Sequence, residues 1–358
     1  MGEKSSIKKG RYLRKAEFLL IIALSFSLYF LLKKEEPRKE EKTELPKSPV
    51  EVAVEAKDKP EEEQNIAVYF DGEVENIVKK MIKSAEKTID AATYTYSRNE
   101  VTDLLDRRHS EGVKIRLAAG KSKDKTRPAH DFTIVKMENG IYHPKFFVFD
   151  GRDVLILSAN ISSSSDASNN AVLFRNAPIA AAILKEEIDD VFEGKVVKRC
   201  VEGCKTEIGT IFFNPGKGCV GIKNEFLNAK KSIKAAIYTV TQKNPVVTGL
   251  KNAVKSGIDT ELILDNWRGD DGKTVNKKAA NYLESIGAKL RYDEPEKSDD
   301  HLFHHKFAEI DGRAAVFGSM NWTASGCYRN REIIVISKDA SVASSFEKYF
   351  DNKKIQKN

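Results

Sequence analysis

The chain repeats itself, and this internal duplication limits the folds it can adopt more than any other feature. Residues 83–96 and 227–240 align without a gap at an offset of 144. In both segments an amphipathic helical pattern runs into a short apolar strand pattern. The identical aligned residues include Ala85/Ala229, Lys87/Lys231, Ile89/Ile233, Ala91/Ala235, Ala92/Ala236 and Tyr94/Tyr238. The sequence therefore predicts two copies of one helix–strand unit.

Each copy continues with a second helix, a glycine that caps it and another strand. These elements are predicted at 101–110, Gly112 and 113–118 in the first copy, and at 245–256, Gly257 and 260–264 in the second. Regular alternation of helices and strands predicts an α/β fold in which helices pack on a sheet in each copy. The periodicity breaks between 195 and 208, so we assign residues 65–206 to the first copy and 207–358 to the second.

The second part of each copy carries polar residues at fixed spacing. The first copy reads His143-x-Lys145, then Asp150, then Ser158-x-Asn160, and the second reads His304-x-Lys306, then Asp311, then Ser319-x-Asn321. A single offset, 161, relates all the shared positions. Residues two apart on a strand point to the same face, so each His and its Lys should lie on one face. Repetition at one offset argues against a chance match of common residue types.

Two such sets suit chemistry on a phosphodiester. Imidazole can attack phosphorus or transfer protons near neutral pH. Lysine and asparagine side chains supply positive charge and hydrogen bonds to phosphoryl oxygens, whose charge must be stabilised in the transition state. Two sets that face each other would place a nucleophile and a general acid on opposite sides of one phosphorus atom, as in-line displacement requires. This chemistry needs neither a metal nor a cofactor, and we predict neither.

The N-terminal region predicts a membrane anchor on a tether. Residues 18–32 are apolar apart from two serines, and as a helix they would rise roughly 22 Å of the ~30 Å hydrocarbon core. Basic residues precede this run, so we expect a cytoplasmic segment at 1–15, one transmembrane helix at 16–33 and an extracytoplasmic catalytic domain. Secretion after cleavage of a signal peptide is the alternative. Residues 34–64, rich in Lys, Glu and Pro, are expected to form a disordered linker.

Charge and cysteine content limit the classes of protein to which the chain can belong. The chain has 60 Lys and Arg against 53 Asp and Glu, a net charge of +7. Such a small surplus permits binding to phosphates but does not identify a nucleic-acid surface. Four cysteines in 358 residues exclude a small disulfide scaffold and form no paired zinc motif. Outside the cytoplasm they can pair, and we expect at least one disulfide, joining Cys219 to Cys200 or Cys204.

The pattern H-x-K-x4-D-x6-G-S-x-N resembles that of the phospholipase D superfamily, the HKD phosphodiesterases. The second copy matches at every defined position, whereas the first has Leu157 where the second has Gly318. The resemblance covers about residues 65–350 and includes features of the nuclease-like branch. It implies two repeats, each a mixed β-sheet flanked by helices, related by a pseudo-twofold axis. It also implies one active site between them, no metal, and a phosphohistidine intermediate resolved by water or another alcohol.

The resemblance further implies a role for each motif residue. It makes His143, Lys145, Asn160, His304, Lys306 and Asn321 catalytic, Ser158 and Ser319 substrate-binding, and Asp150, Asp311 and Gly318 structural. In many members an acidic residue downstream of the Asn orients the catalytic His of the opposite half. Eleven residues after Asn321 stands Glu332, whereas the same spacing after Asn160 gives Ala171. We therefore expect Glu332 to serve His143, making His143 the nucleophile and leaving His304 as the general acid.

Three further residues need an assignment to the site or to the core. His305 stands between His304 and Lys306 and should face away from both. Tyr94 and Tyr238 occupy equivalent positions in the two copies. They could line the active site or belong to the core, and we favour the core.

Three functions remain open from the sequence alone. The favoured one is a membrane-anchored nuclease, because the repeats are compact and the charge is slightly basic. The second is a phospholipase D or phosphatidyltransferase, similar to cardiolipin synthases, which the anchor favours and the long charged linker opposes. The third is an inactive phosphate-binding module, suggested by Leu157 and Ala171. No partner protein is required, because two copies in one chain complete one site.

Overall fold

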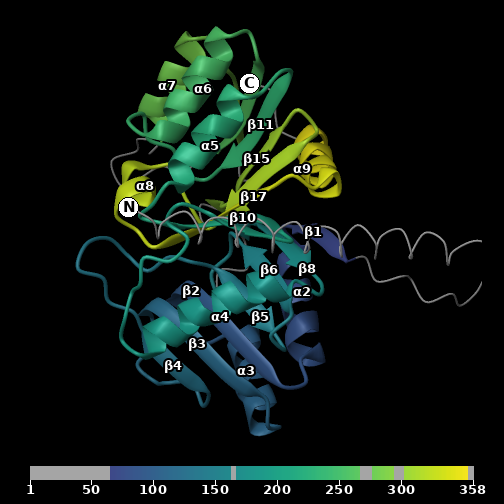
Figure 1. Cartoon of the computed structure of the whole chain (residues 1–358), viewed down its shortest axis with the longest axis vertical. Coiled ribbons are helices and arrows are strands. Elements are labelled where there is room, and N and C mark those ends of the chain that lie inside the picture. Colours follow the sequence, from purple (N-terminus) through teal and green to yellow (C-terminus); the bar gives the residue numbers. More distant parts are fainter. Residues whose placement is uncertain (1–64, 163–166, 267–275, 294–301, 354–358) are drawn as a thin grey trace, which may run out of the picture. The chain divides into compact units, whose positions relative to one another are not determined.

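The computed structural model describes residues 65–162, 167–266, 276–293 and 302–353. Within these residues each copy of the repeat forms a mixed β-sheet covered by helices (Figure 1). The first sheet has the order β1-β8-β6-β5-β2-β3-β4. Its strands are β1 (Ile66–Phe70), β2 (Thr88–Tyr96), β3 (Lys114–Ser122), β4 (Asp131–Ile134), β5 (Phe146–Phe149), β6 (Asp153–Leu157) and β8 (Asn170–Phe174).

The second sheet has the order β13-β12-β11-β15-β16-β17-β10-β9, which repeats the first apart from the edge strand β9. Its strands are β9 (Cys204–Thr206), β10 (Gly209–Asn214), β11 (Ser232–Ile237), β12 (Asp259–Asp265), β13 (Lys289–Asp293), β15 (Lys306–Ile310), β16 (Ala314–Gly318) and β17 (Glu332–Ser337). We expected residues 204–206 in the first copy, but β9 pairs with β10 in the second sheet. The boundary between the sheets therefore precedes Cys204.

The helices pack on both faces of the two sheets. They are α2 (Gly72–Ser84), α3 (Glu100–Ser110), α4 (Pro178–Phe192), α5 (Gly218–Leu227), α6 (Pro245–Lys255), α7 (Lys277–Ser285) and α9 (Ala340–Asn352). One hydrophobic cluster combines α4 and α9 with side chains from both sheets, such as Phe146 and Phe317. Separate clusters cover the other faces, under α2 and α3 in the first half and under α5, α6 and α7 in the second. The halves therefore share one continuous core.

The predicted second helices begin and end close to the expected residues because their caps are local. The Asn99 side chain accepts a hydrogen bond from the Thr102 N–H, and the Thr102 hydroxyl accepts one from the Asn99 N–H, which together form a capping box on α3. Asn244 caps α6 by accepting from the Val247 N–H. These caps leave few backbone donors unpaired at the helix N-termini.

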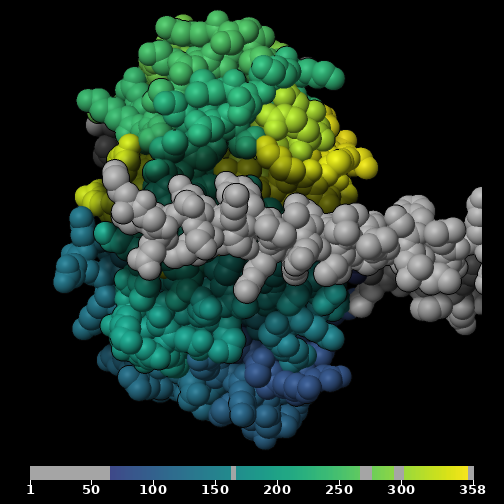
Figure 2. Space-filling model, viewed as in Figure 1, coloured from purple at the N-terminus to yellow at the C-terminus, as the bar shows by residue number. Residues whose placement is uncertain are grey.

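Short segments cross between the halves and tie them together. β7 (Ala167–Ser168) of the first half pairs in parallel with β14 (Leu302–Phe303) of the second. A single parallel bridge joins Tyr142 to Arg331. In the space-filling view the purple-to-teal atoms of the first half and the green-to-yellow atoms of the second fill opposite ends of the described region (Figure 2). The crossing segments therefore join the two sheets.

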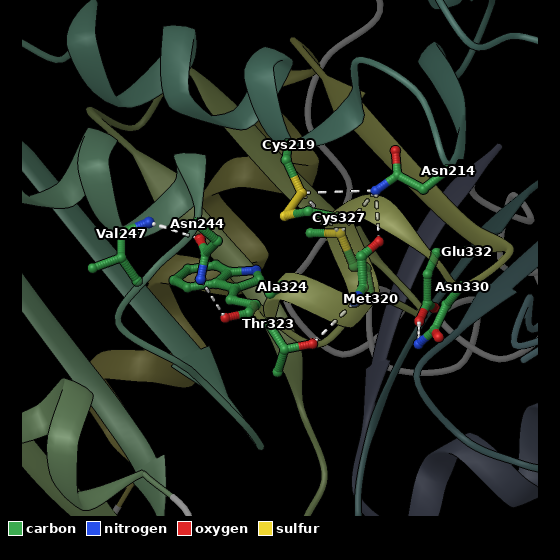
Figure 3. Close-up of a disulfide and its surroundings, with 12 residues drawn as sticks. Asn214, Cys219, Asn244, Val247, Met320, Thr323, Ala324, Cys327, Asn330 and Glu332 are labelled. Carbon is green, nitrogen blue, oxygen red and sulfur yellow. Dashed lines mark hydrogen bonds between the residues drawn. A yellow bond between two sulfur atoms is a disulfide. The ribbon is translucent and has the colours of Figure 1, made fainter. Parts of the chain in front are cut away.

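The disulfides differ from the expected pairing. Cys200 bonds Cys204, and Cys219 bonds Cys327. The prediction of at least one disulfide is confirmed, but the pairing of Cys219 with Cys200 or Cys204 was wrong. Figure 3 shows that Cys219 meets the short helix α8 (Ala324–Tyr328) at Cys327. Closeness in sequence suggested the wrong partner, because α8 reaches Cys219 only once the second sheet has folded.

The predictions for the N-terminal region lie outside the described residues. They comprise the cytoplasmic segment at 1–15, the transmembrane helix at 16–33 and the linker at 34–64. Among the helices that the structure does describe, none has the length and apolar character to cross a bilayer.

Candidate active site

The two His-x-Lys segments are held by the opposite half of the molecule. His143 precedes β5 and His304 precedes β15, so both histidines lie just outside the regular strands in which we expected them. The His143 N–H donates to the C=O of Arg331 at 2.8 Å. The His304 N–H donates to the C=O of Ser168, also at 2.8 Å. These reciprocal bonds bring both segments to the contact between the halves.

The four basic groups of the two motifs share one buried site. His143 and His304 are 6% and 9% exposed, and Lys145 and Lys306 are 0% and 2% exposed. Burial is the main cause that lowers the pKa of both imidazoles, to about 4 for His143 and well below its usual value for His304. The lysine of the opposite motif lowers each pKa further. Each ring therefore lies within electrostatic reach of the other motif.

His143 has the acidic partner that we expected. Its Nδ1 lies 2.6 Å from Glu332 Oε2, across the contact between the halves. The Ser319 hydroxyl also donates to Glu332 Oε2, at 2.6 Å, and Asn330 Nδ2 donates to Oε1 at 3.1 Å. A carboxylate only accepts hydrogen bonds, so the proton of neutral His143 lies on Nδ1 and Nε2 keeps its lone pair.

His304 has an amide partner instead of a carboxylate. Its Nδ1 lies 3.0 Å from Asn169 Oδ1. Asn169 Nδ2 donates to the C=O of Ala167 at 3.0 Å, and the Ser158 hydroxyl donates to Oδ1 at 2.9 Å. These bonds direct Oδ1 toward His304, so Nδ1 of this ring also carries the proton. Nothing in the sequence analysis identified Asn169.

The reason Asn169 was missed is a change of offset between the copies. The ladder pairs Leu157 with Ala171 in the first sheet and Gly318 with Ile334 in the second. Leu157 and Gly318 are 161 apart, whereas Ala171 and Ile334 are 163 apart. The loop after Asn160 is therefore two residues shorter than the loop after Asn321. A constant offset pointed to Ala171. The residue that takes the place of Glu332 in the first copy is instead Asn169.

Ser158 and Ser319, which we expected to bind substrate, have partners inside the protein. Both are 0% exposed. Ser158 donates to Asn169 and accepts from the Asn170 N–H at 2.9 Å. Ser319 donates to Glu332 and accepts from the Ile333 N–H at 3.1 Å. In this arrangement the serines orient the two groups that hold the histidines.

Each motif lysine is held by the backbone carbonyl of the histidine in its own motif. Lys145 Nζ donates to the C=O of His143 at 3.1 Å, and Lys306 Nζ donates to that of His304 at 2.8 Å. An ammonium group has three donors, so each lysine retains capacity for a further acceptor. Burial lowers the pKa of Lys145 to about 7 and that of Lys306 well below its usual value. An anionic ligand between them would restore both charges.

Comparison with known proteins identifies the family. A family model described as "Cardiolipin synthase, PLD-like domain" matches residues 78–192 and 222–354, more than half of the chain. The chain belongs to the phospholipase D superfamily. The solved phosphatidylserine synthase of Haemophilus influenzae Rd KW20 has a similar fold, with a TM-score of 0.61 at 13% identity over 82% of this chain and 87% of that one.

Curated relatives within the phospholipase D superfamily match part of the chain. A mitochondrial cardiolipin hydrolase of Xenopus tropicalis is 28% identical over 129 residues, 35% of this chain and 55% of that protein. A phospholipase D of Rickettsia conorii is 28% identical over 143 residues, 40% of this chain and 67% of that protein. The match spans about half the length of the cardiolipin hydrolases.

In this phospholipase D superfamily member the tyrosines flank the site instead of filling the core. The Tyr94 ring lies 5.2 Å from that of His143, and the Tyr238 ring lies 4.8 Å from that of His304. Lys306 Nζ lies 5.1 Å from the Tyr238 ring. Our preference for the core was therefore wrong. Their equivalent positions in the two copies, one beside each motif, were the signal that they belong to the site.

Asp150 and Asp311 have the structural role that the motif implied. Asp150 accepts from the backbone N–H groups of residues 86–88, and Asp311 accepts from those of residues 230–232. Each carboxylate thus caps the turn that leads into β2 or β11. Gly318 has a φ of 141°, and a Cβ there would lie 2.3 Å from the C=O oxygen of Ile333. Gly318 therefore permits the close approach of β17.

A cavity of about 130 Å³ opens beside His304 and Asn160. Its walls are polar and apolar in similar measure, and the apolar side chains include Val74, Val78, Val101, Leu157 and Ile161. The carboxylates of Asp71 and Glu75 lie at its margin. These carboxylates make the space next to His304 unfavourable for a second phosphate.

Proposed function

We propose that this protein cleaves phosphodiesters through a covalent phosphohistidine on His143, and that its substrate is a phospholipid. The observation that carries the chemistry is the difference between the partners of the two rings. Phosphorylation of Nε2 leaves a positive charge on the imidazole. The Glu332 carboxylate, 2.6 Å from Nδ1 of His143, would stabilise that charge, whereas the neutral amide of Asn169 beside His304 would not.

In the first step Nε2 of His143 attacks phosphorus and the bond to the leaving alkoxide breaks. His304, protonated on Nε2, donates that proton to the leaving oxygen. Because burial lowers the pKa of His304, its protonated form is a strong acid. Lys145, Lys306, Asn160 and Asn321 stabilise the charge on the phosphoryl oxygens.

In the second step water attacks the same phosphorus from the side of His304. His304, now neutral, accepts a proton from the water, and the bond between phosphorus and His143 breaks. The products are a phosphomonoester and the free enzyme. If an alcohol replaces water, the same step transfers the phosphoryl group to that alcohol.

The relatives, the cavity beside His304 and the expected anchor all support the preference for a phospholipid. Relatives of this chain are described as cardiolipin hydrolase and phospholipase D. The cavity beside His304 is lined partly by apolar side chains and partly by polar ones, including the carboxylates of Asp71 and Glu75, which would repel the neighbouring phosphates of a nucleic acid. Residues 16–33, if they anchor the chain as the sequence predicts, would also hold the catalytic domain near its substrate.

Hydrolysis of nucleic acid, which the sequence analysis favoured, is the second candidate. Lys121 Nζ lies 4.8 Å from the Tyr94 ring, so a cation and an aromatic surface adjoin the His143 side of the site. Such a pair can hold a backbone phosphate and a base.

The test incubates the full-length chain with labelled phosphatidylglycerol or cardiolipin vesicles and, separately, with single-stranded DNA and RNA. We expect lipid turnover, with no loss in EDTA. His143→Ala and His304→Ala should each abolish this turnover. With bis(4-nitrophenyl) phosphate, whose leaving group needs no acid, His304→Ala should accumulate an acid-labile phosphoenzyme labelled at His143. Label on His304 in the His143→Ala protein would reverse the roles. Cleavage of nucleic acid alone would establish the second candidate, and no turnover of any substrate would support a binding module.

A further inference from the structure

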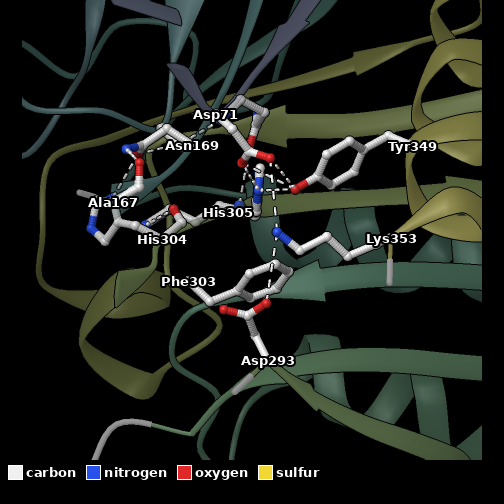
Figure 4. Close-up of polar contacts among 12 residues, drawn as sticks. Asp71, Ala167, Asn169, Asp293, Phe303, His304, His305, Tyr349 and Lys353 are labelled. Carbon is white, nitrogen blue, oxygen red and sulfur yellow. Dashed lines mark hydrogen bonds and ion pairs between the residues drawn. The ribbon is translucent and has the colours of Figure 1, made fainter. Parts of the chain in front are cut away.

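Next to His304 in the chain, His305 closes a polar cluster with two distant residues (Figure 4). His305 Nε2 lies 3.1 Å from Asp71 Oδ1 and 2.8 Å from the Tyr349 hydroxyl. That hydroxyl donates to Asp71 Oδ2 at 3.0 Å. Asp71 follows β1 in the first half and Tyr349 lies in α9 of the second, so the cluster joins the halves. His305 faces away from the catalytic residues, as predicted.

The protonation state of the cluster follows from its contacts. Burial alone would raise the pKa of Asp71, but the hydrogen bond and charge of His305 and the charge of Lys353 lower it to about 2. Burial lowers the pKa of His305, so the ring is neutral at neutral pH and carries its charge only in acid, where Asp71 titrates. A carboxylate only accepts, so the proton lies on Nε2 of His305. Its Nδ1 is buried without a hydrogen-bond partner among the described residues, which fits the unprotonated nitrogen.

The equivalent position in the first copy shows what the cluster replaces. There the residue between the catalytic His and Lys is Pro144, whose ring restricts the backbone by itself. In the second copy His304 and His305 lie between β14 and β15, outside both strands. Neither a strand ladder nor a proline restricts the backbone of this segment. The side-chain hydrogen bonds of His305 restrict it instead.

Asp71 also reaches His304 by a second route. Its backbone N–H donates to the C=O of Asn169 at 2.8 Å, and Asn169 Oδ1 is the acceptor for His304 Nδ1. Asp71 itself has a φ of 53°, which is uncommon for a residue with a side chain. Asp71, in a strained backbone conformation, therefore links His305 to Asn169. The Asn169 amide in turn orients the His304 ring.

We propose that Asp71, His305 and Tyr349 form a positioning cluster that holds the His304 ring in the orientation needed for proton transfer at the leaving group and at the attacking water. This rests on the proposed function, in which His304 is the acid and then the base. None of the three residues touches the reacting atoms, and the cluster acts through the backbone at His304 and through Asn169.

The test follows single and repeated turnovers of bis(4-nitrophenyl) phosphate by the full-length chain. Its 4-nitrophenolate leaves without a proton, so formation of the phosphohistidine does not need His304. Hydrolysis of that intermediate does need His304 as base. For Tyr349→Phe and Asp71→Asn we expect the first turnover to keep its rate and amplitude, and later turnovers to slow by about 10- to 100-fold.

Two controls separate positioning from folding. In Tyr349→Phe the ring can keep its stacking on Phe70, now 4.0 Å between centroids, so this variant should fold even if Asp71→Asn does not. Asp339→Asn alters the N-terminal cap of α9, the helix that carries Tyr349, without touching the cluster. It should leave both phases unchanged.

The outcomes distinguish this proposal from the function on which it rests. Equal slowing of both phases, or a smaller first-turnover amplitude in proportion to unfolded protein, would mean that the cluster only stabilises the fold. Unaltered kinetics in both cluster variants, with later turnovers slowed in His304→Ala, would overturn the cluster alone. If His304→Ala slows neither phase, the proposed roles of the histidines fail first.

Discussion

Glu332 and Asn169 accept a hydrogen bond from the same nitrogen of two equivalent rings but differ by one unit of charge. A carboxylate stabilises a positive imidazole whether the charge comes from a proton or from phosphorus. An amide oxygen fixes the orientation of the ring and offers much less stabilisation of its charge. The two imidazoles therefore differ in chemical character although their burial is similar.

This difference predicts the response of each step to pH. Because the pKa of His304 lies well below its usual value, little of its acid form is present at neutral pH. Turnover that requires an alkoxide to leave should therefore accelerate as the pH falls, until it nears the pKa of about 4 at which His143 becomes protonated and ceases to be a nucleophile. The comparison is the first turnover of saturating bis(4-nitrophenyl) phosphate.

That first turnover needs no acid, so its rate should stay level over the same range and fall only at the acidic end. Stopped-flow absorbance follows the nitrophenyl ester. A parallel assay follows product release from whichever lipid or nucleic acid the protein turns over. Parallel acceleration of both substrates at low pH would contradict the assignment of His304 as the acid.

Among the elements, α4 is tied to the active site by one buried ion pair. Glu187 of α4 pairs with Arg331 through two hydrogen bonds, with side chains 1% and 2% exposed. The Arg331 C=O in turn accepts from the His143 N–H. The guanidinium also lies 4.5 Å from the Phe213 ring. This pair therefore supports the segment that carries the nucleophile.

Removing one member of this pair should cost far more than removing both. Arg331→Met should lower the free energy of unfolding by about 3–5 kcal/mol, because it leaves the Glu187 carboxylate buried without a partner. Glu187→Leu combined with Arg331→Met should recover most of that loss. Urea unfolding of the three proteins measures this. Lys195→Met, at an exposed pair with Glu193, should have no measurable effect. A double variant as unstable as the sum of its single variants would refute the prediction.

The sequence predicted what depends on local patterns and on repetition. The helices α3 and α6 and the paired motifs follow from short-range spacing. The structural role of Asp150 and Asp311 was implied by the family resemblance, because their capping bonds reach residues far away in the sequence. Asn169 escaped because two residues are missing from one loop. The partners of Cys219 and His305 escaped because they come from segments far along the chain. Such contacts form only when the sheets pack, and no local periodicity encodes them.

On the scale of the whole molecule, the two disulfides constrain the chain to very different degrees. Cys219–Cys327 links residues 108 apart and connects α5 to α8, just beyond the second motif. Cys200–Cys204 links residues 4 apart at the boundary between the sheets. Only the long link restricts the unfolded chain over most of the second half.

We therefore expect unequal losses when each bond is removed. By the chain-entropy model, Cys219→Ser with Cys327→Ser should lower the free energy of unfolding by about 5 kcal/mol, and Cys200→Ser with Cys204→Ser by about 2 kcal/mol. Denaturant titration under non-reducing conditions gives both values. Equal losses, or a larger loss for the short link, would show that chain entropy is not the deciding factor.

The crossing of segments between the halves has a consequence for how such a protein can change. Each imidazole is hydrogen-bonded to a residue of the opposite half. A dimer of two identical halves would therefore give both rings the same hydrogen-bond partner. When both copies are joined in one polypeptide, the two partner residues can change independently of each other. The two otherwise equivalent histidines can then take different roles after one substitution and the shortening of one loop.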